Sequence, residues 1–115
     1  MVDDQESRLD ALFAALSDRT RRSLLLTLLE GDQMVKSLAE PFDMSLAAIS
    51  KHIQILVNAG LVTQHKSGRE KWCSLEMDAF RPAAFWIESY GSFIEDGYDA
   101  LEKILTIQNL GDLDA

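Results

Sequence analysis

Four side chains near the middle of the sequence could recognise the base edges of a DNA duplex. They are Ala47, Ser50, Lys51 and Gln54, and they share one arc when residues 45–60 are wound as a helix at about 100° per residue. Serine and glutamine donate or accept hydrogen bonds, alanine contacts a thymine methyl group, and lysine reaches guanine or phosphate. These groups suit a helix laid into a major groove better than a face that is merely solvated.

The opposite arc of the same segment is apolar and is expected to pack into a core. Ile49, Ile53 and Leu56 fall together on this arc, with Ala48, His52, Ile55 and Ala59 alongside. A lone histidine on the apolar side favours a packed, hydrogen-bonded role over direct contact with DNA. The segment therefore has one face for the protein interior and one face for a partner.

Ser45 and Leu46 stand at the start of this segment. Ser45 fits the N-cap position, where a hydroxyl accepts from a backbone N–H, and phosphate contact by the neighbouring N–H groups would add to that role. Leu46 lies near the edge of the apolar arc, but its place in the first turn would expose it to DNA. Both residues join the candidate DNA contacts.

Arginine and lysine side chains elsewhere could contact the phosphate backbone. Arg19, Arg21 and Arg22 open a preceding helix, where cations oppose the helix dipole, so helix stability does not explain them. Phosphate contact by Arg21 and Arg22 is one account, and ion pairing within the protein is the other. Arg69 and Lys71 flank a predicted hairpin tip, from which they would reach a minor groove or phosphate, with ordinary surface charge as the alternative.

Apolar spacing and turn signals predict the elements that position these residues. Helices are expected over about 6–16, 19–30, 35–40, 45–60 and 78–106, with β-strands over 61–66 and 71–75. The third helix stops at Pro41, and the turn to the Ser45 cap makes a helix-turn-helix. A hairpin directly after it predicts a winged variant, mainly α with a small β-hairpin, in the order α-α-α-α-β-β-α.

Length and composition predict one domain over residues 1–115. The chain is 47% hydrophobic, and it lacks an apolar run of the roughly 18 residues that would cross a bilayer, so we expect a cytoplasmic protein with no membrane partner. The formal net charge is -8, but residues 19–71 carry eight Lys or Arg against five Asp or Glu. A basic middle between acidic flanks fits a protein that presents one face to DNA.

Several short motifs resemble one family in the family's order. They are Ala15-Leu-Ser-Asp-Arg-Thr-Arg-Arg22, Leu38-Ala-Glu-Pro-Phe-Asp-Met-Ser45, Ser50-Lys-His-Ile53, Ala59-Gly-Leu-Val62 and Gly68-Arg-Glu-Lys-Trp72. Together they resemble the arsenic-repressor (ArsR/SmtB-type) family of winged-helix transcription regulators. The resemblance implies a homodimer built from the first and last helices, at about 6–16 and 78–106. It also implies two recognition helices in successive major grooves of a palindromic operator, and repression by blocking transcription.

Metal ligands typical of that family are missing. Where family members carry a cysteine motif, this chain has Val35-Lys-Ser-Leu-Ala-Glu40, and its last helix contains no histidine. Asp78, Glu88, Glu95 and Asp96 alone do not make a usual zinc site, and the single cysteine, Cys73, cannot close a soft-metal site. The last predicted helix, with Trp86-Ile-Glu-Ser-Tyr90 followed by Phe93, resembles that of the metal-independent subgroup, and we expect no metal and no cofactor.

Aromatic residues line the last predicted helix, and they leave the question of a small-molecule effector open. The stripe includes Phe85, Trp86, Tyr90, Phe93 and Tyr98, a spacing that favours core and dimer packing over a pocket for a hydrophobic effector. Catalysis is not expected, because there is no nucleophile motif, no Gly-rich phosphate loop and no carboxylate pair of evident purpose. The alternative functions are a protein-interaction module of the same fold that has lost DNA binding, and a repressor relieved by a small hydrophobic effector.

Overall fold

The computed structural model describes residues 4–112, except for the side chains at positions 92, 93, 95, 96, 98 and 108–112. The chain divides between Ala83 and Ala84 into two compact units, and each is described here by itself. The first unit holds the candidate recognition helix and the hairpin. The interpretation of residues 1–115 as one domain with dimerisation helices at both ends stays a prediction.

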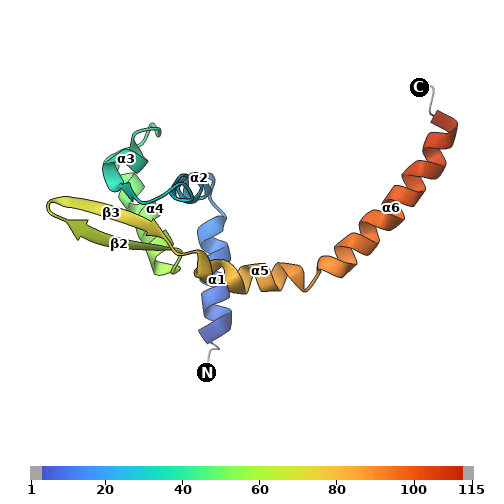
Figure 1. The fold of residues 1–115 in the computed structure, drawn as a ribbon, viewed down its shortest axis with the longest axis horizontal. Helices are drawn as coiled ribbons and strands as arrows, with labels where there is room; N and C mark the ends of the chain where they lie inside the picture. Colours follow the sequence, from blue (N-terminus) through green and yellow to red (C-terminus); the bar gives the residue numbers. More distant parts are fainter. Residues whose placement is uncertain (1–3, 113–115) are drawn as a thin grey trace. The chain divides into compact units, whose positions relative to one another are not determined.

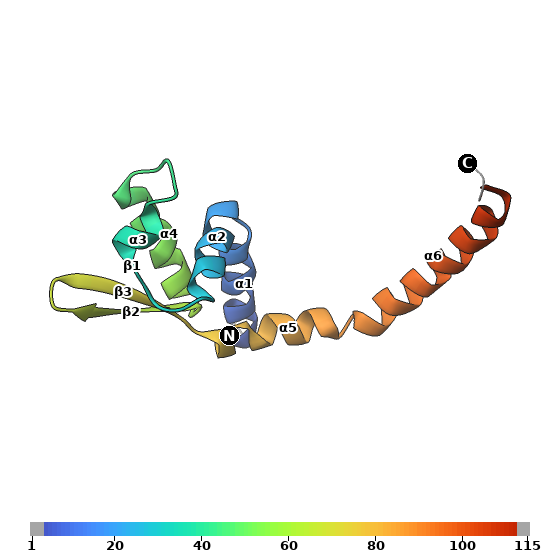
Figure 2. The same cartoon turned by 45° about the horizontal axis from the view of Figure 1, so that its top comes forward.

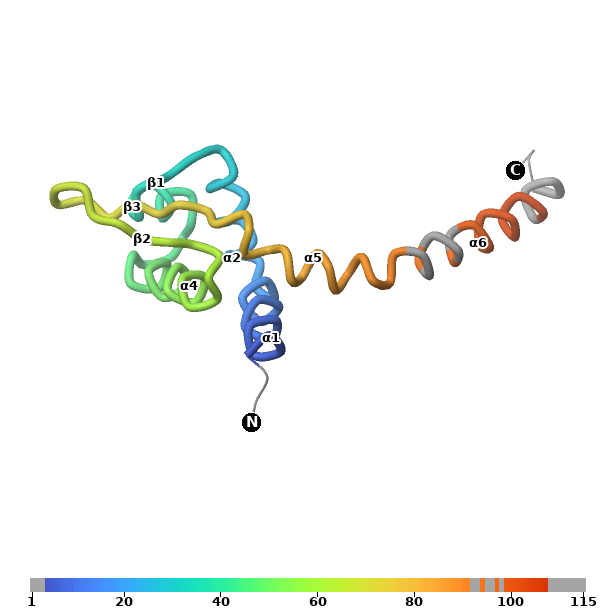
Figure 3. Tube along the Cα trace, turned by 60° about the horizontal axis from the view of Figure 1, so that its bottom comes forward, coloured from blue at the N-terminus to red at the C-terminus, as the bar shows by residue number. Residues whose placement is uncertain are grey.

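Helices and strands of the first unit follow the predicted order. They are α1 (Asp4–Leu16), α2 (Arg19–Leu28), β1 (Gln33–Met34), α3 (Val35–Ala39), α4 (Leu46–Asn58), β2 (Val62–Ser67) and β3 (Glu70–Leu75). The structure adds β1, which the sequence analysis missed. This two-residue strand pairs antiparallel with β3, which lies between β1 and β2 in the sheet (Figure 3).

The core of the first unit gathers one apolar stripe from each helix. Ile49, Ile53 and Leu56 of α4 are buried, as the predicted apolar arc requires. They belong to one cluster with buried side chains of the other elements, namely Leu12, Ala15, Leu24, Leu25, Leu28, Val35, Leu38, Leu61, Val62 and Cys73. Ile55, placed beside the apolar arc by the sequence analysis, is instead 40% exposed. The buried arc of α4 is therefore narrower than predicted, and more of its surface faces outward.

Capping side chains set where α2 and α4 begin. The Asp18 carboxylate accepts a hydrogen bond from the backbone N–H of Arg21 at 3.0 Å, so Asp18 is the N-cap of α2. The Ser45 hydroxyl accepts from the backbone N–H of Ala48 at 3.1 Å, as predicted. Figure 2 shows α3 and α4 packed together on either side of the intervening turn. The Ser45 cap fixes the first turn of α4, which carries candidate DNA contacts.

The hairpin of β2 and β3 extends beyond the helices with α4 beside it (Figure 1). Its two strands pair from Val62 with Leu75 to Ser67 with Glu70. Gly68 at the tip has φ +65°, a left-handed conformation that glycine adopts without strain. The predicted turn at residues 67–70 thus projects the hairpin tip as a wing.

The prediction of one continuous helix over residues 78–106 is wrong. A 3₁₀ turn at Met77–Phe80 leads into α5 (Arg81–Glu88), and after a break α6 runs over Gly91–Asp112. At the break the Ser89 hydroxyl donates to the carbonyl of Trp86, and Tyr90 makes an i to i−3 backbone bond to Ile87. The Ser89 side chain competes for a backbone carbonyl, and Gly91 has a low helix propensity. Together they interrupt the helix, although the amphipathic spacing of the sequence continues.

Candidate nucleic-acid interface

The outer face of α4 presents the four predicted base-contacting residues together. Ala47, Ser50, Lys51 and Gln54 are all exposed, while Ile53 between them is buried, so α4 is amphipathic as expected. The Gln54 amide donates to the Asn58 side-chain oxygen at 2.9 Å, one turn further along the helix. This bond orients the Gln54 amide and leaves its own oxygen free to accept. The face offers small groups, donors, acceptors and one cation to a partner.

The first turn of α4 adds an apolar margin to this face. Leu46 is 49% exposed, as predicted for a residue that could touch DNA, and Met44 just before it is 37% exposed. The Ser45 hydroxyl is occupied by its cap bond, so a phosphate contact there would come from backbone N–H groups. Sequence reasoning missed Met44, because its position in a turn carries no periodic signal.

The wing carries three exposed cations. Arg69 lies at the tip of the hairpin, Lys71 follows in β3, and Lys66 stands directly across from Lys71 in β2. In the part of the chain that the structure describes, no hydrogen bond or ion pair engages the side chains of Lys51, Arg69 or Lys71. Lys66 was not among the predicted contacts, although the cross-strand pairing of 66 with 71 follows from the predicted hairpin. Like charges directly opposite are unfavourable by themselves, and an anionic partner would relieve them.

Arg21 and Arg22 bond to the end of α1. Arg21 donates from Nε to the Ala15 carbonyl at 2.8 Å and from Nη2 to the Ala14 carbonyl at 3.1 Å. Arg22 donates from Nη1 to the Leu16 carbonyl at 2.7 Å. These carbonyls belong to the last turn of α1, so both guanidinium groups cap its C-terminus. Phosphate contact by Arg21 and Arg22 stays a prediction, and the structure supplies an intramolecular role beside it.

Two titratable groups of this unit have shifted pKa values. The backbone N–H of Arg21, hydrogen-bonded to the Asp18 carboxylate, lowers the pKa of Asp18, and the positive charge of the Arg21 guanidinium acts in the same direction. Burial raises the pKa of Cys73, whose sulfur accepts from the Gln64 amide at 3.8 Å. The Cys73 thiol is fully buried and stays protonated at neutral pH, which suits a packing role rather than a reactive one.

Among the described residues, no group of three or more His, Cys, Asp or Glu side chains comes together in a way that could hold a metal ion. The side chains of Phe93, Glu95, Asp96 and Tyr98, which the sequence analysis considered, lie outside that set. Within the described chain, every helix is too short or too polar to span a bilayer.

An apolar groove of about 300 Å³ lies on the first unit. Its walls come from the ends of α1 and α2, from the end of β3 and from the segment that follows β3, and include Leu25, Leu26, Leu29, Leu75 and Met77. Leu26, Leu29 and Met77 are each more than half exposed. Small apolar molecules occupy grooves of this size and lining in other proteins. Phe80, which lies within the last predicted helix at 78–106, also lines this groove, whereas Phe85, Trp86 and Tyr90 of the aromatic stripe do not.

Known proteins resemble this chain in sequence and fold. Residues 16–65 match the family model described as a helix-turn-helix domain. The transcriptional repressor SdpR of Bacillus subtilis is 33% identical over 79 residues, which cover 69% of this chain and 88% of that protein. A crystal structure of an ArsR family transcriptional regulator is 36% identical, with a TM-score of 0.73 over 83% of this chain and 97% of the other. A solution structure of a homodimeric winged helix-turn-helix DNA-binding domain from Mycobacterium bovis, 22% identical, has a TM-score of 0.62 over 83% of this chain and 93% of the other.

Proposed function

The chain belongs to the ArsR family of transcriptional regulators, and on that premise we propose that it is a repressor that binds double-stranded DNA as a homodimer. The observation that carries the proposal is the uncovered outer face of α4, where Ala47, Ser50, Lys51 and Gln54 lie together. Small and hydrogen-bonding side chains on an exposed helix match the edges of bases in a major groove. The cations of the wing would contact the flanking phosphates.

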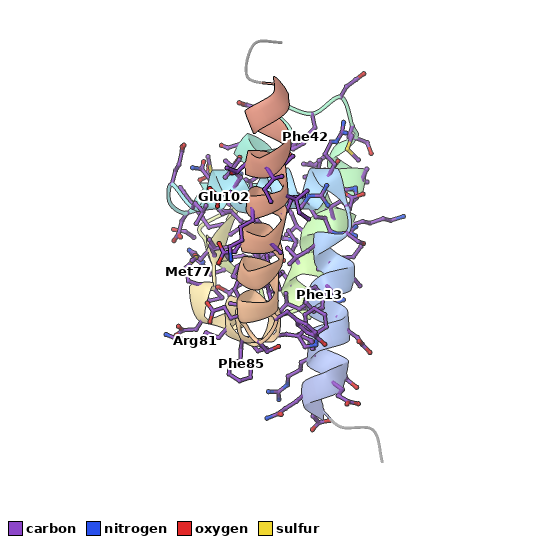
Figure 4. The ribbon with its side chains drawn as sticks, turned by 90° about the vertical axis from the view of Figure 1, so that its right-hand side faces the viewer. Phe13, Phe42, Met77, Arg81, Phe85 and Glu102 are labelled. Atoms are coloured by element: carbon purple, nitrogen blue, oxygen red, sulfur yellow. The ribbon has the colours of Figure 1, made fainter. Side chains whose placement is uncertain are left out.

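A homodimer is supported by apolar surface on the C-terminal elements. Large apolar side chains of α5 and α6 are exposed, among them Phe85, Ile87, Leu101, Ile104 and Ile107. The side chain of Phe85 extends away from the ribbon of α5 (Figure 4) and is 75% exposed. Such surface favours burial against a second copy, and the similar Mycobacterium bovis domain is itself described as homodimeric. A two-fold dimer would place two recognition helices about 34 Å apart, on a palindromic operator.

We also propose that the protein uses no metal, is not an enzyme and acts in the cytoplasm. The protein would work without a metal, because the positions that carry cysteine in metal-sensing relatives hold Val35-Lys-Ser-Leu-Ala-Glu40. It would regulate transcription rather than catalyse a reaction, and it would act in the cytoplasm, where bacterial DNA is found. The first relative named above is likewise a repressor.

Selection from random duplexes tests the proposed function. Purified full-length protein is incubated with random double-stranded DNA, and bound molecules are amplified and sequenced over several rounds. A palindromic sequence with half-sites one helical turn apart should be enriched. Absence of enrichment at low salt would contradict DNA recognition and would favour the alternative, an interaction module of the same fold.

Replacing Arg69 with alanine is expected to weaken binding to all duplexes alike. Arg69 lies at the exposed wing tip, where we place a backbone contact, so its loss should reduce the slope of log affinity against log salt by about one per contact. Titration of the selected duplex and a scrambled duplex at several salt concentrations measures this slope. Arg81→Ala is the matched control, because Arg81 is exposed but paired with Asp78 at 3.1 Å. Equal slopes for R69A and the wild type would remove the wing contact.

A further inference from the structure

A network of side chains joins the recognition helix α4 to the end of α1 and the start of α2. Its centre is Arg21, whose guanidinium already caps the Ala14 and Ala15 carbonyls of α1. The third nitrogen of the same guanidinium, Nη1, lies 3.2 Å from Nδ1 of His52 in the middle of α4. Arg21 of α2 therefore contacts both α1 and α4. Because its planar group is held by three bonds, it fixes their relative positions more rigidly than apolar contacts alone.

His52 can take part in this network in one protonation state. Arginine only donates, so the 3.2 Å contact is a hydrogen bond when Nδ1 of His52 carries no proton and accepts. The Asp18 carboxylate lies 3.9 Å from the same nitrogen, beyond hydrogen-bond reach, and is itself engaged as the N-cap of α2. The His52 side chain is 19% exposed, so the contact is largely shielded from solvent.

We propose that His52 is a positioning residue, which holds α4 against α1 and α2 through Arg21 so that its outer face meets DNA at the right angle. His52 is next to Lys51 and two positions from Ser50 and Gln54, but its own side chain faces inward. A small rotation of α4 about its axis would move all the base-contacting side chains together. The inference rests on the proposed function, because it concerns the orientation of the DNA-binding helix.

Protonation of His52 should therefore weaken DNA binding. Among the described residues, the charged groups placed at His52 are Arg21 and Asp18, both from α2, while α1 contributes only carbonyl oxygens that Arg21 already occupies. A proton on Nδ1 removes the acceptor and sets a second cation against Arg21. The protonated ring is instead attracted to Asp18, at the cost of its bond to Arg21. Affinity should be highest when the His52 ring is neutral and should fall when the ring gains a proton.

The test uses the fact that the chain has two histidines. His65→Asn removes the other histidine, an exposed residue of β2, and leaves His52 as the only one in a full-length background. In this background the affinity for the selected duplex is measured at fixed ionic strength from pH 8 to pH 5.5. We expect an affinity loss of about tenfold on acidification, the scale of one lost hydrogen bond to a charged group.

Two substitutions in the same background separate positioning from simple packing. His52→Asn keeps an acceptor near the place of Nδ1 and does not titrate, so it should retain the affinity measured at pH 8 and lose the pH dependence. His52→Leu keeps an apolar body and removes the acceptor, so it should bind about tenfold more weakly at every pH. Circular dichroism confirms that each variant is folded. NMR of ¹⁵N-labelled protein should show Nδ1 of His52 unprotonated at pH 8.

The outcomes distinguish this inference from the proposed function. Failure of the H65N protein to bind any duplex at pH 8 would overturn the proposed function and the inference with it. Normal binding at pH 8, together with unchanged affinity in H52L or with no loss on acidification, would overturn the inference alone. A proton on Nδ1 at pH 8 would also overturn it, because His52 would then have no acceptor for Arg21.

Discussion

Replacing Ile53 with alanine is expected to lower the free energy of unfolding by about 3 kcal/mol. Ile53 is 1% exposed and lies in the middle of α4, where it packs with the core residues of the first unit. Truncation removes the transfer free energy of three carbon atoms and leaves a cavity that close-packed neighbours fill only in part. Urea unfolding followed by circular dichroism measures the loss.

The next residue of the helix provides a matched control for Ile53. Gln54 is exposed, so Gln54→Ala should change the free energy of unfolding by less than about 0.5 kcal/mol. Gln54→Ala should nevertheless weaken DNA binding, whereas Ile53→Ala should affect binding only through the folded fraction. Similar stability losses for the two variants would contradict the assignment of opposite faces to positions 53 and 54.

The two faces of α4 could be predicted because each follows from helix periodicity within one short segment. Ile49, Ile53 and Leu56 recur at helical spacing, and the Ser45 cap sets the start of the helix. Ile55 shows the limit of that reasoning. Periodicity says which residues share an arc, but the width of the buried arc depends on which neighbouring elements reach it, and none covers Ile55 fully.

Strand β1 and the break before α6 were not predictable for different reasons. Gln33–Met34 is too short for an alternating pattern, and it becomes a strand only because β3 offers a free edge far along the chain. The break at Ser89 and Tyr90 is local, but the apolar spacing continues across it, so periodicity alone indicated one helix. Ser89 and Gly91 lower helix propensity at the break, but the hydrophobic spacing on both sides is the stronger feature of the sequence.

The sequence analysis favoured a packed, hydrogen-bonded role for His52, and the structure confirms it. The bonding partners of Arg21 and His52 could not be derived from sequence, since they depend on contacts between separate helices. A cation in the first turn of α2 is unfavourable for that helix, which led to phosphate contact and ion pairing as competing accounts. The structure shows the guanidinium of Arg21 at the C-terminus of α1, where a cation is favourable. The Arg21 guanidinium thus opposes the dipole of α2 and complements the dipole of α1. Only the packing of α1 on α2 shows this.

Replacing Lys51 with glutamate is expected to weaken binding to the selected duplex by more than about tenfold. Lys51 is exposed on the outer face of α4 and, among the described residues, has no acidic partner to lose. In a bound duplex its ammonium group would lie near guanine or phosphate, and a carboxylate there would be repelled by the phosphate backbone. A homodimer carries the change twice, once in each half-site. Gel-shift titration at constant salt measures the loss, and circular dichroism verifies that the fold is intact.

A second charge reversal separates a local contact from the effect of net charge. Lys103 is an exposed residue of α6, so Lys103→Glu changes the formal charge by the same amount without touching α4. A contact between Lys51 and the duplex is lost only in K51E, so this control should alter affinity far less than K51E does. Equal losses for the two variants would mean that the overall field of an acidic protein governs binding, and the outer face of α4 would then lose its role as the recognition surface.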